Sequence, residues 1–329
     1  MIGERVLITG ACGFVGSHMV ELLASRGCSV VATDIRADPI VTEIPNVEFH
    51  ISDLTRKKTL EPLFDGIERV FHVAALFDYR APWEQLYQVN VAGTKHLCEA
   101  ALNDDLESMV VWSSGSVYGM PDEIPAKETT TLKPINNYEK SKVEQEKAAF
   151  EFFKQNGLPV TILRPASIYG PRSKQGTAVL IFMLSKGELP AIPGDGRSRP
   201  ATVHVRDVVG AAEYLSGKQT AIGESFNIGD DSKYSIEDLL LAAAEMLGVR
   251  IRKLHVPIWA LNLYASWSEW QAKRKGRRTE VERESIRYLV YDSLLDNSKI
   301  KATGYRLLYP DPVLGLKETI AWYKSEGWL

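Results

Sequence analysis

A glycine-rich turn near the start of the chain limits its fold more than any other feature. The segment 9–16 reads TGACGFVG, follows the apolar run 5–9 and precedes a helical pattern at 15–26. Glycines at a strand-to-helix turn, here Gly10, Gly13 and Gly16, let the backbone approach a pyrophosphate at the positive end of the helix. An ordinary tight turn can carry the same glycines, but the flanking strand and helix favour a dinucleotide site.

Short β-rich runs alternate with helical patterns through the first half of the chain, which is typical of a parallel sheet covered by helices. Strands are expected at 5–9, 29–34, 47–50, 68–73, 108–113 and 159–164, and helices at 15–26, 83–102 and 136–155. A strand–helix unit at 202–216 and a strand at 224–228 follow a proline-rich stretch. We predict an α/β fold: a Rossmann doubly wound parallel sheet with a smaller, mainly helical C-terminal region. Residues 1–165 would form the dinucleotide-binding domain, to which 202–228 returns, and 166–329 an interleaved substrate-binding region.

The composition narrows the class of protein. The 329 residues are 45% hydrophobic with a net charge of -3, an ordinary globular profile without a signal for nucleic acid. Cys12, Cys28 and Cys98 lack C-x-x-C spacing and the histidines lack metal-ligand spacing, so we expect a reducing compartment and no metal. The chain enters its first strand at once and has no apolar run of about 18 residues. We therefore expect a cytoplasmic protein without a signal peptide or a membrane-spanning helix.

Residues after the later strands indicate which dinucleotide binds. Asp34 ends the second strand about 20 residues beyond the glycines, where a carboxylate accepts hydrogen bonds from the ribose hydroxyls and repels a 2′-phosphate. This favours NAD over NADP, although the guanidinium of Arg36 could bind that phosphate. Four further residues could reach the adenine or line the path of the cofactor: Asp53, Leu54, Ala74 and Ala75. A solvated Asp53 that opens a helix is an equally good interpretation of that residue.

Tyr138 and Lys142 are the candidate proton-transfer pair. They lie at positions i and i+4 of one predicted helix and so on one face. A cation beside a phenol stabilises the phenolate, and burial near the positive ring of the nicotinamide adds to this effect. We expect the two together to lower the pKa of Tyr138 toward the working pH. Ser114, after the strand 108–113, can hold the substrate oxygen. The alternatives are that Tyr138 and Lys142 form a chance pair on a surface helix and that Ser114 is an ordinary turn residue. The co-occurrence of these three residues with the glycine turn instead predicts hydride transfer to or from a nicotinamide.

The chain resembles an extended short-chain dehydrogenase/reductase of the NAD-dependent epimerase/dehydratase superfamily. The matching segments are TGACGFVG, Asp34, Asp53-Leu54, HVAA at 72–75, NVAGT at 90–94, SSGSVYG at 113–119, YEKSK at 138–142, LRP at 163–165, PGDG at 193–196 and VHV at 203–205. The resemblance implies that Ser114, Tyr138 and Lys142 are catalytic and that Asn90 supports their hydrogen-bond network. It also implies a homodimer formed through the helices at 83–102 and 136–155. The cofactor contacts that it adds are Phe14, Val15, Pro165 and Ser167.

Three departures from the family pattern count against a nucleotide-sugar substrate. Ser167 stands where sugar-nucleotide epimerases have an Asn, and Pro200 stands where many have an Arg, although Arg199 is close enough to substitute. The R-P-G-D segment common near their C-terminus is missing. Gly115-Ser116 replaces the Asp-Glu pair of the 4,6-dehydratases, so dehydration is not expected.

The C-terminal third points to an apolar substrate. Trp259, Leu263, Trp267 and Trp270 form one helical stripe, followed by basic residues. Such a segment, 257–278, suits a peripheral membrane contact or a lid over an apolar substrate, and an ordinary core helix has the same periodicity. The helix and the later DNSK at 296–299 resemble the 3β-hydroxysteroid dehydrogenase-like branch, which includes sterol-4-carboxylate 3-dehydrogenases.

The function predicted from the sequence is NAD-dependent oxidation of a secondary alcohol, or reduction of the corresponding ketone, on a bulky, apolar, sterol-like substrate. A substrate with a β-carboxylate would give a β-keto acid that loses CO₂. A nucleotide-sugar 4-epimerase with bound NAD and a non-catalytic NAD(P)-sensing protein are the alternatives. The expected substrate contacts are Phe77, Tyr79, Trp83, Ser116, Arg199 and Trp267.

Overall fold

A seven-stranded parallel sheet forms the centre of the protein. The computed structural model describes residues 2–102, 105–189, 191–274 and 283–329. The strands follow the order β10-β6-β5-β4-β1-β2-β3, and every neighbouring pair is parallel. Their bounds are β1 Arg5–Thr9, β2 Ser29–Asp34, β3 Val47–Ile51, β4 Arg69–His72, β5 Ser108–Trp112, β6 Val160–Pro165 and β10 Ser225–Ile228. The chain reverses its direction of travel between β1 and β4, so the crevice at their carboxyl ends is the topological switch point of the sheet.

Alternating side chains of the strands bury the two faces of the sheet under helices. Val6 and Ile8 pack on one face with α1 (Phe14–Ser25) and α7 (Val205–Ser216). Leu7, between them, packs on the other face with α4 (Gly93–Ala101) and α5 (Asn137–Asn156). This period of two, with apolar residues on both faces, is expected of a parallel sheet inside an α/β protein. The predicted Rossmann fold is confirmed, as are the strands of the first half to within one or two residues.

The predicted helix 83–102 is divided into three parts. α3 (Trp83–Leu86) leads into a π-helical segment, η3 (Tyr87–Ala92), before α4 begins at Gly93. The wider π turn contains Asn90, whose buried amide bonds to the loop after β4 and to α5. By contrast, α5 has the predicted length because its end signals are local. Asn136 caps its first turn and Gly157 ends it in a left-handed conformation.

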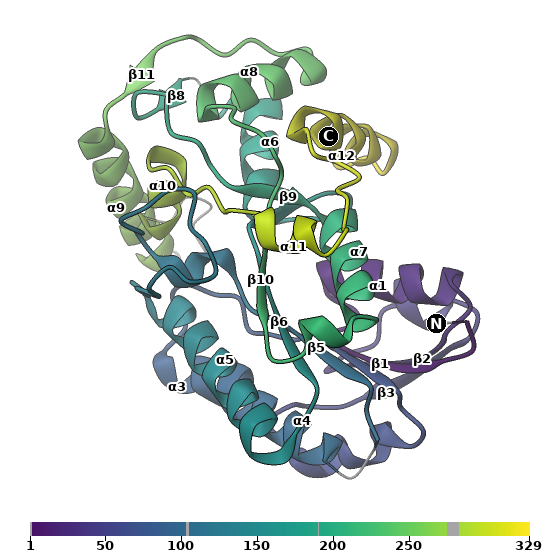
Figure 1. Ribbon diagram of the computed structural model, residues 1–329. Helices are drawn as coiled ribbons and strands as arrows, with labels where there is room; N and C mark the ends of the chain where they lie inside the picture. The colour runs from purple at the N-terminus through teal and green to yellow at the C-terminus, as the bar shows by residue number, and fades with distance from the viewer. Residues whose placement is uncertain (1, 103–104, 190, 275–282) are drawn as a thin grey trace.

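The remaining elements form a mainly helical region at the carboxyl end of the sheet (Figure 1). Its helices are α6 Thr177–Ser185, α8 Ile236–Leu247, α9 Ile258–Arg274, α10 Arg283–Val290, α11 Ser298–Ala302 and α12 Pro312–Ser325. Two short parallel pairs accompany them, β7 (Ser167–Tyr169) with β9 (Thr202–His204) and β8 (Ile192–Pro193) with β11 (His255–Val256). Single turns complete the chain at α2 Pro39–Thr42, η1 Lys57–Thr59, η2 Glu61–Phe64, η4 Gly115–Tyr118 and η5 Gln219–Ala221.

The stretch 202–228 is shared between the two regions. β9 pairs with β7 and so lies outside the large sheet, whereas α7 packs on that sheet and β10 forms its edge beside β6. The chain therefore leaves the sheet after β6 and returns to it, which places the helical region over the carboxyl ends of the strands. None of the helices within the described residues is long and apolar enough to cross a membrane.

Candidate active site

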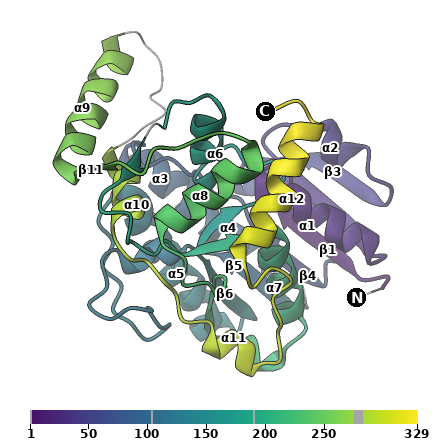
Figure 2. The same ribbon diagram turned by 90° about the horizontal axis from the view of Figure 1, so that it is seen from above.

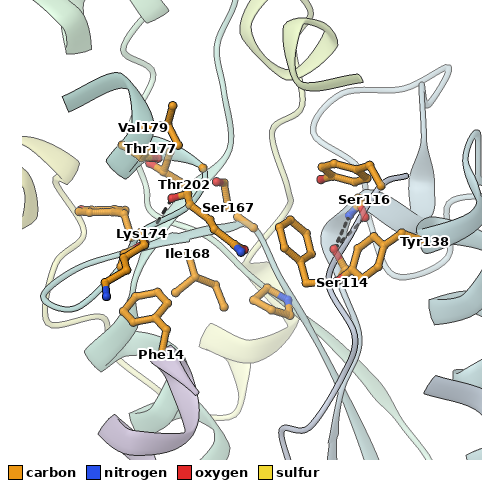
Figure 3. Close-up of a pocket in the computed structure, with 18 of the residues that line it drawn as sticks. Phe14, Ser114, Ser116, Tyr138, Ser167, Ile168, Lys174, Thr177, Val179 and Thr202 are labelled. Carbon is orange, nitrogen blue, oxygen red and sulfur yellow. Dashed lines mark hydrogen bonds between the residues drawn. The ribbon is translucent and has the colours of Figure 1, made fainter. Parts of the chain in front are cut away.

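A large cavity lies between the carboxyl edge of the sheet and the helical region. Its volume is about 1660 Å³. The glycine turn, the ends of β1, β5 and β6, and helix α5 form one wall, and residues of α6, α8 and α9 form the other. Figure 3 shows this arrangement, with Phe14 of α1 on one side, Ser114 and Tyr138 on another, and Thr177 and Val179 of α6 opposite.

The glycine turn is packed so closely that side chains are excluded. Gly10 has φ +68°, and a Cβ there would lie 2.7 Å from the Cα of Ala74. A Cβ on Gly16 would lie 1.9 Å from the carbonyl oxygen of Gly10. Gly13 is the N-cap of α1 and offers no side-chain hydrogen bond to the first turn of the helix, so the amide groups of that turn are left to bind an anion at the cavity wall. The turn therefore fits a dinucleotide pyrophosphate.

Asp34 is held at the end of β2 by the same turn. Its Oδ2 accepts a hydrogen bond of 3.0 Å from the amide of Cys12, and its Oδ1 accepts one of 2.8 Å from the amide of Ile35. Arg36 lies beside it on the cavity wall. All the predicted cofactor contacts line this one cavity: Gly10, Gly13, Phe14, Val15, Gly16, Asp34, Arg36, Asp53, Leu54, Ala74, Ala75, Tyr138, Lys142, Pro165 and Ser167.

Tyr138 and Ser114 point toward one another across the cavity floor (Figure 3). The hydroxyl of Ser114 lies 2.8 Å from that of Ser116 and accepts the Ser116 amide at 3.1 Å. The Tyr138 ring is buried, and the rings of Phe77 and Tyr79 meet it edge-on at centroid distances of 4.9 Å and 5.6 Å. This aromatic setting fixes the ring and excludes water from it.

Burial is the largest cause of the pKa shifts of Tyr138 and Lys142. It raises the pKa of Tyr138 well above its ordinary value, and a hydrogen bond with Ser114 offsets only part of that shift. Burial also lowers the pKa of Lys142 to about 7, against the opposing charge of Glu146. The Lys142 amine donates a hydrogen bond of 2.6 Å to the carbonyl of Trp112. Lys142 is not among the groups that shift the pKa of Tyr138, so the lowering expected from Lys142 together with the nicotinamide ring stays a prediction for the cofactor-bound protein.

Asn90 lies behind the cavity and does not line it. Its Oδ1 accepts the Leu76 amide at 2.7 Å, and its Nδ2 donates to Ser141 Oγ at 2.9 Å. Ser141 in turn donates to the carbonyl of Tyr138 at 2.7 Å. The completely buried Asn90 thus connects the loop after β4 to the first turn of α5, which sets the position of the Tyr138 backbone.

The structure brings half of the predicted substrate contacts to the cavity. Phe77, Tyr79 and Ser116 line it. The other three lie elsewhere. The Trp83 ring lies under the amine of Lys140 at 4.4 Å, Arg199 donates through Nε to Asp292 Oδ2 at 2.9 Å, and Trp267 lies on the outer surface of α9 with 53% of its area exposed. Direct substrate contact by Trp83, Arg199 and Trp267 does not fit these positions.

Two groups of residues escaped the sequence analysis. The first is the apolar wall from α6, α8 and α9, for which the signal was the almost wholly apolar sequence TAVLIFMLS of α6. The second is a pair of buried polar networks. His72 lies 2.8 Å from both Thr9 Oγ1 and Thr94 Oγ1, and Glu146 pairs with Arg164 at 2.6 Å. No local motif marks these networks, because their members lie far apart in the sequence.

The parallel sheet, the glycine turn at its switch point and the wall of Ser114, Tyr138 and Lys142 define a Rossmann-type dinucleotide-binding protein. Residues 6–229 match the NAD dependent epimerase/dehydratase family. The chain belongs to this family, that of the extended short-chain dehydrogenases/reductases, whose enzymes depend on NAD.

Relatives of the chain act on different substrates. It is 31% identical to a decarboxylating sterol-4-alpha-carboxylate 3-dehydrogenase of Bos taurus over 266 residues, 78% of this chain and 73% of that protein. A UDP-glucose 4-epimerase of Thermotoga maritima, crystallised with UDP-glucose, superposes with a TM-score of 0.81 at 26% identity, covering 98% of this chain and 99% of that one. A UDP-glucose 4-epimerase of Thermus thermophilus, crystallised with NAD, has a TM-score of 0.77 at 25% identity, with coverages of 97% and 99%.

Proposed function

We propose that the protein is an NAD-dependent dehydrogenase that oxidises a secondary alcohol on a bulky, apolar, sterol-like molecule. The observation that carries this proposal is the apolar wall of the cavity facing Tyr138. It is built by side chains of three helices that meet over the sheet: Val179, Leu180, Phe182 and Met183 of α6, Leu239, Leu240 and Ala243 of α8, and Ala260, Leu261 and Tyr264 of α9. A ligand buried against such a wall gains mainly from the removal of apolar surface from water.

The residues of the opposite wall would hold the cofactor. The glycine turn and the uncapped first turn of α1 suit the pyrophosphate, and Asp34 suits the adenosine ribose and disfavours a 2′-phosphate. Bound there, NAD supplies the hydride acceptor for oxidation of the carbinol carbon.

The proton of the alcohol would be transferred by a set of three residues, Ser114, Tyr138 and Lys142. The Ser114 hydroxyl, steadied by Ser116, orients the substrate oxygen, and Tyr138 removes its proton. Because burial raises the pKa of Tyr138, ionisation of the phenol requires nearby positive charge. Lys142, four residues along the same helix and on the wall of the same cavity, would supply that charge when it is protonated. A β-keto acid formed by the oxidation would lose CO₂ without a further side chain.

A nucleotide-sugar 4-epimerase is the second candidate. It is supported by the full-length similarity to a UDP-glucose 4-epimerase and by Lys174, which lines the cavity near Phe14 (Figure 3) and could bind a phosphate. Arg199 weakens this candidate, since it lies outside the cavity and pairs with Asp292. The apolar lining favours the dehydrogenase.

The proposal is tested by incubating the protein and NAD with a panel of candidate substrates and following NADH formation by its absorbance. We expect turnover with 3β-hydroxysterols or their 4-carboxylates, and none with UDP-sugars. Interconversion of UDP-glucose and UDP-galactose without net NADH would establish the epimerase instead. NAD binding without turnover of any member would favour the sensing protein.

The homodimer implied by the resemblance is proposed as well, with α4 and α5 at its interface, and analytical ultracentrifugation tests it.

A further inference from the structure

The outer face of α9 carries a stripe of large apolar side chains. Trp259 and Leu263 are 68% and 63% exposed, and Trp267 and Trp270 are each 53% exposed. With 3.6 residues per turn, the four side chains fall within an arc of about 80°. The small Ala265, on the opposite side of the helix, is the buried residue of α9. The arrangement of an ordinary surface helix is therefore reversed: the apolar stripe faces away from the core.

The stripe lies beside the cavity. Leu261 and Tyr264 belong to the same helix, line the cavity, and occupy the side of the helix between the stripe and Ala265. Figures 1 and 2 place α9 at the periphery of the molecule, and no helix or strand of the described residues covers its outer side. An apolar surface therefore continues from the exposed stripe to the cavity wall.

Charge at the two ends of the stripe selects its partner. Arg250, Arg252 and Lys253 are exposed in the segment that leads into α9, and Lys273 and Arg274 are exposed in its last turn. The guanidinium of Arg274 lies 4.6 Å from the Trp270 ring centroid. No acidic side chain of the described helix falls within the arc of the stripe. Tryptophans between cations are typical of a helix that lies in the interfacial layer of an anionic membrane.

We propose that α9 binds the surface of an anionic lipid bilayer through Trp259, Leu263, Trp267 and Trp270. The cavity wall of α9 then opens beside the membrane, and an apolar substrate enters from the bilayer without crossing water. The contact with the bilayer is independent of the reaction, whereas this route for the substrate rests on the proposed function.

Vesicle flotation without NAD or substrate tests the contact. Wild-type protein should float with vesicles of phosphatidylcholine and phosphatidylglycerol, and at least tenfold less with phosphatidylcholine alone. The variant W259S/W267S/W270S should lose at least tenfold in binding, and K273E/R274E should lose the preference for the anionic lipid. L308S/L314S is the matched control, because Leu308 and Leu314 are 66% and 57% exposed and lie near α12, away from α9 (Figures 1 and 2).

Three outcomes would overturn the contact: wild-type protein that floats with neither vesicle, a triple variant that floats like wild type, or equal losses in the triple variant and the control. Circular dichroism melting excludes unfolding, since exposed side chains contribute little to stability. A different result would assign the stripe to a contact between protein chains. In that case wild-type protein would be oligomeric and would not float with vesicles, and the triple variant would be monomeric.

A kinetic comparison tests the route. The triple variant should raise KM at least fivefold for substrate delivered in vesicles and leave KM for detergent-solubilised substrate unchanged. If the triple variant and wild type have equal KM values for substrate delivered in vesicles, the route is refuted, and the contact with the bilayer is not.

Discussion

Replacement of Glu146 by Gln should destabilise the protein strongly, because Glu146 is the counter-charge of a buried guanidinium. The Glu146 and Arg164 side chains are 4% and 6% exposed. Arg164 donates to the carboxylate through Nε at 2.9 Å and Nη2 at 2.6 Å, and Ser113 donates its hydroxyl to the same group. E146Q leaves the guanidinium buried without a counter-charge, and such losses cost about 3–5 kcal/mol. The pair also joins α5, which carries Tyr138, to the ends of β5 and β6.

Urea unfolding followed by circular dichroism measures this cost. The matched control is Glu144, two residues earlier on α5, which pairs with Lys147 at 2.8 Å on the surface. E144Q should change the free energy of unfolding by less than about 0.5 kcal/mol, because an exposed ion pair contributes little. Equal losses in E146Q and E144Q, both below about 1 kcal/mol, would refute the assignment of a buried ion pair that holds α5 to the sheet.

Three further predictions follow from the site. Asp34→Ala should weaken NAD binding and reduce the preference for NAD over NADP, because it removes the carboxylate that binds the ribose and repels a 2′-phosphate. Isothermal titration of both cofactors checks this, and a wild-type preference for NADP would contradict it. Because burial raises the pKa of Tyr138, the phenolate is a minor form near neutral pH, so alcohol oxidation should accelerate as the pH rises from about 7 to about 10, whereas ketone reduction, which uses the phenol, should change little; an oxidation rate that does not depend on pH over this range would count against Tyr138. Burial lowers the pKa of His72 from 6.5 to about 3, so protonation favours the unfolded chain; the stability that His72 contributes above about pH 6.5 should fall by about 2 kcal/mol by pH 5. In urea titrations His72→Gln should remove this part of the pH dependence, while the part from His18 and His204, whose pKa values burial also lowers, should remain.

The parts of the structure that the sequence predicted are those with local signals. The glycine turn, the Asn136 cap and the Gly157 end of α5 each specify backbone conformation over a few residues, and the structure places β1, α1 and α5 accordingly. The structure places Ser114, Tyr138 and Lys142 on one cavity for the same reason. These residues end one strand and begin one helix, and parallel β/α units bring such positions to one edge of the sheet.

The parts that the sequence did not predict depend on partners far along the chain. The π segment contains Asn90, whose partner Ser141 is 51 residues away, and Arg199 leaves the cavity for Asp292, 93 residues away. The stripe of α9 illustrates a different limit. Helical periodicity is the same whether a stripe faces the core or the solvent, and only the burial of Ala265 shows which side packs inward.

The most direct test of the proposed chemistry compares Tyr138→Phe with wild type in NAD binding and in single-turnover NADH formation, with the substrate found in the panel. The change removes the hydroxyl that exchanges the proton and keeps the ring that packs against Phe77 and Tyr79. We predict an NAD dissociation constant within a few-fold of wild type and a rate lower by about two to four orders of magnitude. A variant that keeps more than about a tenth of the wild-type rate would show that another group transfers the proton.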